Sequence, residues 1–301
     1  MKKGIIKKIF NWTINILYYS VLLVVAYHVL QVFVCATFKI PSGSMEPTIA
    51  IGDNVLVNKL AYGARLFDVT KDVKHGDIYR MPGFTNVKRN DIIVFNNPRA
   101  NHKIRHSLSF DVLKYFIKRC VALPGDTFEI INCHYHVRGC NEPLGNVAAQ
   151  DDLERHVCHL RHKADSDTDV YRYLRSYPKH RDFPWTIENM GPIYIPKEGD
   201  QIELNSQNFI LYEKLMNWEM DTTIIEKDGQ FFVGDSLIES YTFDQNYYFV
   251  CGDNAVDSQD SRYWGLVPEE FIAGKALMVW YSYDKFLGRT RWERIGTWLG
   301  N

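Results

Sequence analysis

The chain has 301 residues, of which 46% are hydrophobic and 24% charged, and its formal net charge is −1 at pH 7. A charge this close to zero argues against a nucleic-acid-binding protein, and the sequence contains neither a fixed-period repeat nor a low-complexity tract. The length suffices for one large domain or two.

A membrane anchor is the first predicted element. Residues 9–38 contain no Asp, Glu, Lys or Arg, and a cluster of lysines precedes them: Lys2, Lys3, Lys7 and Lys8. About 20 apolar residues cross a bilayer as a helix. We therefore expect residues 1–38 to form a cytoplasmic tail and one transmembrane helix. Because basic flanks stay in the cytoplasm, the chain after Lys39 should lie on the extracytoplasmic side.

The competing interpretation of this stretch is a cleaved secretory signal peptide. Val34, Cys35 and Ala36 are acceptable in size for a cleavage site. The apolar stretch, however, exceeds the about 7–15 residues of a signal-peptide core. A retained anchor is the favoured interpretation.

Short β-type runs dominate the chain after the anchor, separated by Gly, Pro, Asn and Asp. Apart from the anchor, the pattern predicts no long amphipathic helix. We expect a mainly antiparallel β fold whose strands include residues 54–57, 91–95, 128–131, 201–204, 247–250 and 276–280.

Six cysteines and ten histidines raise the question of disulfides and metals. Cys133 and Cys140 flank a hairpin-like stretch and could form a disulfide if the domain lies outside the cytoplasm. The remaining candidates match no zinc spacing, so we predict no metal and no cofactor. Residues 151–182, rich in Arg, His and Asp, are expected to form an exposed polar excursion. The candidates set aside are His134, His136, His156, Cys158, His159 and His162.

A candidate nucleophile lies just beyond the anchor, in residues 40–48 (IPSGSMEPT). A serine hydroxyl attacks a carbonyl only after a base takes its proton. Gly43 gives the backbone freedom to expose the N–H of Ser44, and the Ser42 hydroxyl could join it in holding an oxyanion. Each such donor lowers a barrier by about 3–4 kcal/mol. The ordinary alternative is a loop whose serines satisfy backbone groups.

The candidate base is Lys118, within an apolar run of residues 115–123 (YFIKRCVAL). A lysine accepts a proton only when it is neutral, so burial must lower its pKa from about 10.4. Strand alternation predicts that neighbouring side chains bury Lys118. In an arbitrary strand, a solvent-facing lysine would be the ordinary interpretation.

A third segment, residues 252–265 (GDNAVDSQDSRYWG), follows the serine and lysine segments along the chain. Together the three segments resemble bacterial type I signal peptidases, which are membrane serine endopeptidases that remove signal peptides from exported preproteins. The resemblance covers nearly all of the chain outside the polar excursion. It implies a β-rich catalytic domain in two parts, residues 39–126 and 247–301 with a C-terminal tail, around an inserted second β-containing domain at residues 127–246.

The resemblance also assigns roles to individual residues. It implies that Ser44 is the nucleophile and Lys118 the general base, with Ser42 and the Ser44 N–H as oxyanion donors. Ser258 would orient the lysine, and Asp260 and Arg262 would form a supporting ion pair. Two small substrate pockets would be lined by Phe38, Ile40, Met45, Ile49, Val55, Val94, Phe116 and Ile117.

Two departures from the family pattern stand out. Asn90 replaces a glycine in an Arg-Gly-Asp strand motif, and Ala255-Val256 stand where the family has an arginine after Gly-Asp-Asn. Because the catalytic serine and lysine are both present, we still expect activity.

The implied partners are signal peptides of preproteins and membrane lipid, with no nucleic acid, and the enzyme should be a monomer in the bacterial cytoplasmic membrane. Aromatic residues near the end of the chain, among basic residues, suit a lipid interface; Phe286, Trp292 and Trp298 are the stronger candidates, whereas Trp280 and Tyr281 suit the core. A silent binding module would lack the serine or the lysine. A self-cleaving Ser/Lys regulator would lack the anchor.

Overall fold

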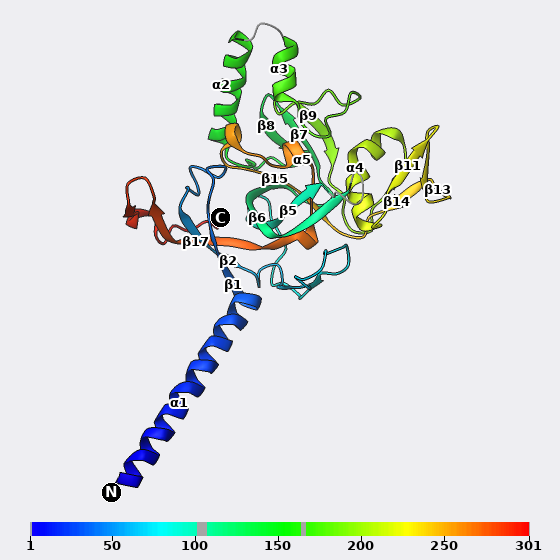
Figure 1. The fold of residues 1–301 in the computed structure, drawn as a ribbon. Coiled ribbons are helices and arrows are strands. Elements are labelled where there is room, and N and C mark those ends of the chain that lie inside the picture. The colour runs from blue at the N-terminus through cyan, green and yellow to red at the C-terminus, as the bar shows by residue number, and fades with distance from the viewer. Residues whose placement is uncertain (1, 101–106, 164–166, 301) are drawn as a thin grey trace.

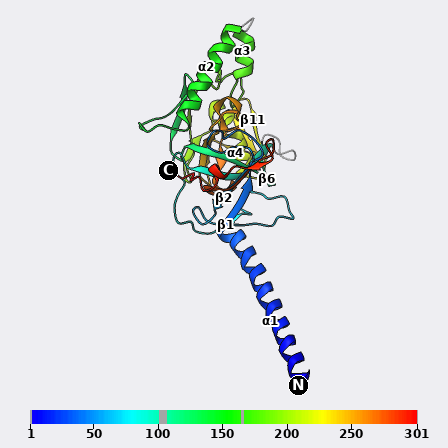
Figure 2. The same cartoon turned by 90° about the vertical axis from the view of Figure 1, so that its left-hand side faces the viewer.

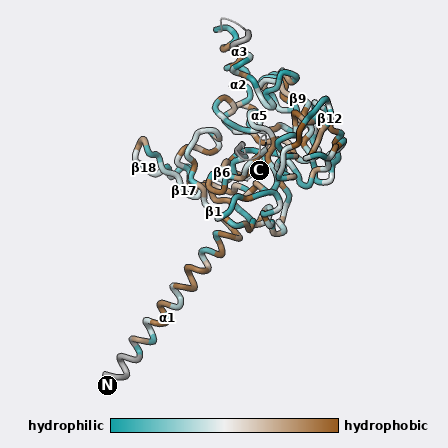
Figure 3. Tube along the Cα trace, turned by 45° about the vertical axis from the view of Figure 1, so that its right-hand side comes forward, coloured by the Kyte–Doolittle hydropathy of each residue, from teal (hydrophilic) through white to brown (hydrophobic). Residues whose placement is uncertain are grey.

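The computed structural model describes residues 2–100, 107–163 and 167–300. Helix α1 (Lys2–Val29) leaves one end of the body as a straight rod (Figure 1) and continues into a π-helical turn, η1 (Leu30–Val34). Residues Phe10–Val34 form the one helix in the described ranges that is long and apolar enough to cross a membrane, and much of the rod is hydrophobic (Figure 3). This agrees with the predicted single span.

The anchor is shorter than the sequence indicated. The helix ends at Val34, and strand β1 (Cys35–Lys39) begins at once. The expected boundary at residue 38 was wrong because these residues pair with strand β2 (Asp53–Asn58), from Cys35 opposite Asn58 to Lys39 opposite Asn54. That pairing satisfies backbone groups that a longer helix would have bonded internally.

A lysine joins the end of the anchor to the body. The Lys59 Nζ donates hydrogen bonds to the carbonyls of Gln31, at 2.7 Å, and Val32, at 3.3 Å. The last carbonyls of a helix have no partner within the helix, so the ammonium group completes this terminus. The membrane helix therefore passes into the sheet without a flexible linker.

The body is organised around an eight-stranded sheet, and the pairings printed for its strands are all antiparallel. This confirms the mainly antiparallel β fold, and the six predicted strands all fall on observed ones. The strand order is β1-β2-β17-β5-β6-β15-β16, and β18 pairs with β17. The new members are β17 (Ile272–Asp284), β5 (Ile92–Ala100), β6 (Leu108–Ala122), β15 (Tyr247–Cys251), β16 (Val267–Pro268) and β18 (Arg289–Thr290).

Smaller sheets occupy the chain between β6 and β15. One has the order β8-β7-β9, one joins β10 to β14, and one has the order β11-β12-β13. A further pair, β3 with β4, precedes β5. Their bounds are β3 (Arg65–Leu66), β4 (Tyr79–Arg80), β7 (Thr127–Ile131), β8 (His134–Val137), β9 (Met190–Tyr194), β10 (Gln201–Glu203), β11 (Ile224–Lys227), β12 (Gln230–Val233), β13 (Ser236–Ile238) and β14 (Ser240–Thr242).

Helices also occur where none was predicted. They are α2 (Val147–Lys163), α3 (Asp167–Leu174) and α4 (Ser206–Glu219), and α2 and α3 lie at the end of the molecule opposite α1 (Figures 1 and 2). Shorter helical turns complete the chain: η2 (Ala255–Asp257), α5 (Ser261–Trp264), η3 (Glu269–Phe271) and η4 (Trp292–Arg294).

The stretch of residues 151–182 is a largely exposed projection, as predicted, but much of it is helical, which the sequence did not predict. Helix α2 buries Ala149, Leu153 and Val157, spaced four apart, against Val170 and Leu174 of α3. One apolar stripe is enough to hold a helix against a body. Charged residues of α2, among them Glu154, Arg155 and Lys163, are exposed.

The main core crosses the proposed domain boundaries. Phe128 of β7 stacks on Phe249 of β15 with ring centroids 4.3 Å apart, and one cluster of buried side chains contains residues from both regions. The division at residues 127 and 246 stays a prediction. Cys133 and Cys140 are both free thiols, so the disulfide left open by the sequence is not formed here; the Cys133 side chain is buried beside α2 instead.

Candidate active site

Ser44, in the loop after β1, lies next to Lys118 of β6. The Lys118 Nζ lies 2.6 Å from the Ser44 Oγ and donates a second hydrogen bond to the Ile117 carbonyl at 3.0 Å. Lys118 stands opposite Ile93 of β5, one residue before the point where β6 begins to pair with β15. The serine loop therefore approaches β6 next to the point where its pairing with β15 ends.

The environment of Lys118 favours its neutral form. The side chain is only 3% exposed, and this burial lowers the pKa of Lys118. The Asp260 carboxylate acts in the opposite direction, whereas the Arg262 guanidinium lowers the pKa further. Burial therefore outweighs the opposing effect of the Asp260 charge on the pKa of Lys118.

Asp260 and Arg262 form the ion pair that the resemblance implied. Two hydrogen bonds of 2.8 Å join the guanidinium to the carboxylate, and both side chains are fully buried. Burial is the largest single influence and raises the pKa of Asp260, but the charge and hydrogen bonds of Arg262, together with the Gly252 N–H, outweigh it, and the pKa is lowered. The pair thus places little net charge beside Lys118.

The segment after β15 holds the serine loop in place. The Asn254 backbone N–H donates to the Ser44 carbonyl at 3.1 Å, and its side chain donates to the Gly43 carbonyl at 3.2 Å. The Asp253 carboxylate accepts from Thr48 at 2.6 Å and from Arg119 at 2.7 and 2.5 Å. Within the described residues, the Ser44 N–H makes no hydrogen bond, so it is available to an incoming oxygen.

Sequence reasoning assigned no role to Thr48, Arg119 or Asp253. All three lie in the segments that carry the family resemblance, residues 40–48, 115–123 and 252–265, so the sequence marked their neighbourhood. What the sequence did not show is that these segments bind one another. Arg119 also donates to the Asn90 carbonyl at 2.8 Å, which extends the connection to the start of β5.

Ser258 is buried but does not orient Lys118 in this conformation. Its hydroxyl forms no regular hydrogen bond within the described residues, although its proximity helps to lower the pKa of Asp260, and it lies against Gly252. A Cβ at Gly252 would come within 2.1 Å of the Ser258 Oγ and 2.4 Å of the Ser44 carbonyl oxygen. Only glycine fits between them, so Gly252 keeps Ser258 next to the nucleophile loop. The orienting role stays a prediction.

Replacing Ser258 by Ala tests that role. If the hydroxyl turns to Lys118 during turnover, kcat should fall about five-fold, which corresponds to about 1 kcal/mol for one hydrogen bond. KM should change little. Because the hydroxyl forms no regular hydrogen bond in the resting enzyme, the melting temperature should not fall. Steady-state kinetics with a peptide substrate separate the two parameters, and an unchanged kcat would remove Ser258 from the site.

A cleft of about 320 Å³ runs along Ser44 and Lys118. Of the predicted pocket residues, it is lined by Phe38, Ile40, Val94, Phe116 and Ile117, and the exposed Ser42 lines it too. The other three predicted pocket residues do not line it and are fully buried in the core beneath: Met45, Ile49 and Val55. Leu113 and Tyr115 also line the cleft and were not foreseen.

The two departures from the family pattern have local explanations. Asn90 has a φ of 67°, in the left-handed region that favours glycine and tolerates asparagine. Its side chain donates to the Pro143 carbonyl and accepts from the Gly145 N–H at 2.8 Å. Ala255 is buried, and its carbonyl accepts from Arg262 at 3.0 Å.

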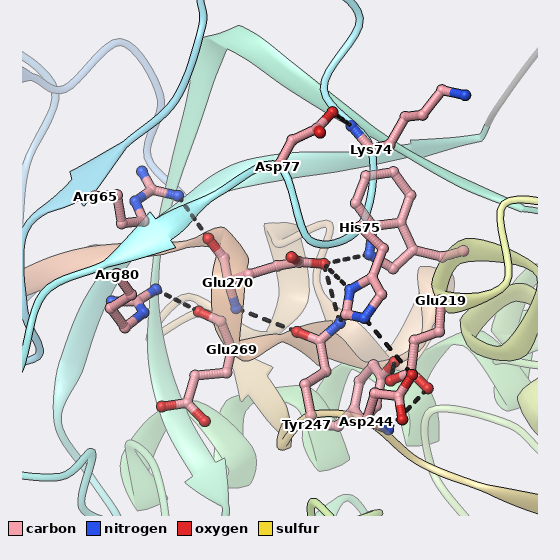
Figure 4. A network of polar contacts seen from close by, with 12 residues as sticks. Arg65, Lys74, His75, Asp77, Arg80, Glu219, Asp244, Tyr247, Glu269 and Glu270 are labelled. Carbon is pink, nitrogen blue, oxygen red and sulfur yellow. Dashed lines mark hydrogen bonds and ion pairs between the residues drawn. The ribbon is translucent and has the colours of Figure 1, made fainter.

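A second polar network, none of whose members named here lines the cleft, was not predicted from the sequence. His75 Nδ1 lies 3.0 Å from the Glu270 carboxylate, and Tyr247 donates to Glu219 at 2.5 Å (Figure 4). Arg65 and Arg80 donate to backbone carbonyls in the same region. The hydrogen bond that the Glu270 carboxylate accepts raises the pKa of His75. The network fastens the residues around β3 and β4 to the start of β17, and its members are too far apart in sequence to form a motif.

One group in the described residues has ligand atoms close enough for a metal: His134, Asp151 and Glu154. The His134 Nε2 already lies 3.0 Å from the Asp151 carboxylate; the Asp151 side chain is 48% exposed, and Glu154 is exposed. An ion pair accounts for this arrangement. It lies outside the cleft, and no step at Ser44 depends on it.

Comparison with known protein families identifies the family of this chain. The sequence profile described as "Signal peptidase, peptidase S26" matches residues 12–281. The chain belongs to this signal peptidase family. The resemblance drawn from three short segments is confirmed over nearly the whole length.

Several curated signal peptidases are similar to this family member. Signal peptidase I of Pseudomonas aeruginosa is 31% identical over 281 residues, which cover 89% of this chain and 73% of that protein. Signal peptidase I of Buchnera aphidicola subsp. Acyrthosiphon pisum is 27% identical, with 86% and 72% covered. Signal peptidase I of Aquifex aeolicus is 27% identical, with 87% and 81% covered.

Proposed function

We propose that this protein is a membrane-bound serine endopeptidase that cleaves N-terminal signal peptides from exported preproteins, with Ser44 as nucleophile and Lys118 as general base. The observation that carries the proposal is the 2.6 Å approach of the buried Lys118 Nζ to the Ser44 Oγ beside an open cleft. Membership of the signal peptidase family supplies the reaction class.

The reaction follows from this geometry. Neutral Lys118 takes the Ser44 proton as Oγ attacks the scissile carbonyl carbon. The carbonyl oxygen becomes an oxyanion, held by the Ser44 N–H and the Ser42 hydroxyl. The C–N bond then breaks, and the Lys118 ammonium gives its proton to the leaving amine. Water, deprotonated by Lys118, hydrolyses the acyl-enzyme and restores Ser44.

The cleft is suited to an extended peptide. Among the residues that the structure describes, β1 pairs only with β2, and β6 pairs with β15 only from Arg119 onward. The strands flanking the cleft therefore each leave backbone groups to which a substrate strand can bond.

The apolar side chains of the cleft predict small substrate residues at the first and third positions before the cut. Ile40, Val94 and Ile117 leave shallow hollows, in which Ala fits and a large side chain clashes. Peptides with Ala at both positions should be cleaved at least about ten-fold faster than those with Phe at either. Competition between such peptides measures the ratio, and equal rates would contradict the shallow-pocket argument.

The membrane placement is also part of the proposal. The one apolar helix found in the described residues fits a single-pass membrane protein. We infer that the lysine-rich N-terminus is cytoplasmic and that the catalytic body lies on the outer side of the bacterial cytoplasmic membrane. β1 begins directly after the anchor, so Ser44 stays close to the lipid. A monomer without cofactor or nucleic acid suffices for the reaction proposed.

Aromatic residues at the end of the chain support direct lipid contact. Phe286 is 93% and Trp292 77% exposed, and Trp298 is 61% exposed. Phe286 and Leu287 occupy the turn between β17 and β18, which projects sideways from the body (Figure 1). Trp280 and Tyr281, expected in the core, are also partly exposed. Exposed Trp favours the bilayer interface.

Replacing Trp292 and Trp298 by Ser should weaken lipid binding. A protein lacking residues 1–34 is expected to sediment with phospholipid vesicles, and the double variant should bind about ten-fold more weakly, because two indole rings no longer enter the interface. Replacing the exposed Tyr173, on α3, by Ser is the matched control. If the truncated protein ignores vesicles yet cleaves peptides normally, the anchor alone holds the enzyme at the membrane.

The decisive experiment is cleavage of a secretory precursor by the purified full-length protein in detergent. The wild type should release the mature protein, and Ser44→Ala should not. A wild type that binds the precursor without cutting it would instead indicate a binding module.

A further inference from the structure

A second hollow continues from the active-site cleft toward the membrane anchor. It has a volume of about 280 Å³, and we name it the upstream chamber. Its walls include Val32 from the end of the anchor and Ala273 of β17. Leu66 of β3 and Val69, which follows that strand, also line it. Phe38 and Tyr115 line both the chamber and the cleft.

These two shared side chains form the boundary. The rings of Phe38 and Tyr115 have centroids 4.9 Å apart and planes inclined at 53°. Phe38 comes from β1 and Tyr115 from β6, the strands that flank the cleft. A peptide strand lying between them therefore passes from the cleft over this ring pair into the chamber.

The chamber is apolar in effect, although two cations line it. The Lys59 Nζ is bonded to the carbonyls of Gln31 and Val32. Arg65 donates to two backbone carbonyls of residues 270–271 and to the Asn96 side chain. With these groups engaged, the stems of both side chains add apolar surface. The remaining positive charge disfavours a basic occupant.

Strand geometry gives the position that reaches the chamber. Tyr115 precedes Lys118 by three residues, which is about 10 Å along a strand. A substrate strand beside β6 covers the same length in about three residues. Its first and third side chains face the cleft, and alternation turns the fifth toward the same side, beyond the ring pair. The chamber also lies toward the anchor, the direction from which a membrane-embedded segment arrives.

We propose that the upstream chamber binds an apolar side chain at the fifth position before the cut in the same preprotein. This rests on the proposed function, because the occupant is part of the substrate held at Ser44. The recognised part of the substrate then extends to the fifth position before the cut, beyond the first and third. The chamber selects a large apolar residue, whereas the cleft selects small ones.

The test compares peptides with the full-length enzyme in one detergent. Each extends from about seven residues before the cut to about four after it, has Ala at the first and third positions, and differs only at the fifth, which is Leu, Ala or Lys. The kcat/KM for Leu should exceed that for Ala by about five-fold, the value of partly burying one leucine. Lys should be cleaved more slowly than Ala.

Variants locate the effect. Val69→Arg and, separately, Leu66→Arg should abolish the preference for Leu. Val147→Arg, at an exposed valine on α2, is the matched control and should keep it. A peptide that begins at the third position should be cleaved equally by all of these proteins, which shows that each variant is folded and active.

The outcomes separate this inference from the function on which it rests. Equal cleavage of the Leu and Ala peptides by the wild type would overturn the chamber and leave the proposed function standing; this comparison requires no variant. A preference for Leu that survives both chamber variants would also overturn it. Cleavage of no peptide, the shortest included, would overturn the proposed function and the chamber together.

Discussion

Ser44→Ala is expected to lower the rate of precursor cleavage by about 10⁴ to 10⁶-fold, because a methyl group cannot form the acyl-enzyme. The fold should be unaffected, since the Asn254 N–H bonds to the Ser44 backbone carbonyl rather than to the hydroxyl. The measurement is single-turnover cleavage by protein purified free of host enzyme, with the melting temperature recorded on the same sample.

Ser42→Ala provides a graded comparison. It removes one proposed oxyanion donor and leaves the nucleophile, so the loss should be about 10²- to 10³-fold. Ser42 is exposed at the cleft, and its replacement should not alter stability. Turnover retained by purified Ser44→Ala would show that another group attacks the substrate.

Lys118→Arg should be as inactive as Ser44→Ala although it keeps the positive charge. A guanidinium remains protonated at any useful pH and cannot accept the serine proton. Lys118→Met, which keeps the length and apolar stem, should also be inactive. If either variant cleaves at a rate near that of the wild type, Lys118 is not the base.

The same substitutions predict opposite effects on stability. Burial lowers the pKa of Lys118 in the folded protein, so the unfolded chain binds a proton more readily. The resulting penalty is absent above the unfolded pKa, appears as pH falls below it, and reaches its full size below the lowered folded pKa. At neutral pH, Lys118→Met removes this penalty and should raise the melting temperature, whereas Lys118→Arg buries a permanent charge and should lower it.

The pH dependence of the wild type follows from the same shift. The kcat/KM should rise as Lys118 loses its proton, with a midpoint below the ordinary lysine pKa because of burial. A rate independent of pH across that range, with chemistry shown to be rate-limiting, would indicate a different base.

The sequence contained the local parts of this site. Alternation along residues 115–123 predicted that Lys118 is buried, and the glycine before Ser44 predicted an exposed N–H. These are properties of short segments, governed by backbone geometry. The β-type runs were predicted for the same reason, since strand periodicity is visible within a few residues.

What could not be predicted depends on partners distant in sequence. The bonds from Asp253 to Thr48 and Arg119 join three segments, and none of the three shows its partner. Residues 35–38 were predicted to end the anchor, but they belong to β1, which pairs with β2. Helix α2 was overlooked because its polar residues outnumber the Ala149, Leu153 and Val157 stripe, whose meaning depends on what lies opposite.

The direct passage of the anchor into β1 makes the bilayer part of the enzyme's geometry. The span of 25 residues is about 37 Å long as a helix, which exceeds the about 30 Å of a hydrocarbon core. Such a helix tilts, and by an amount that depends on membrane thickness. Because Lys59 fastens the helix end to the body, the tilt turns the whole body with it. Lipid chain length thus sets the angle and height at which the cleft faces an emerging substrate, and a thinner bilayer presents the same active site in a different orientation.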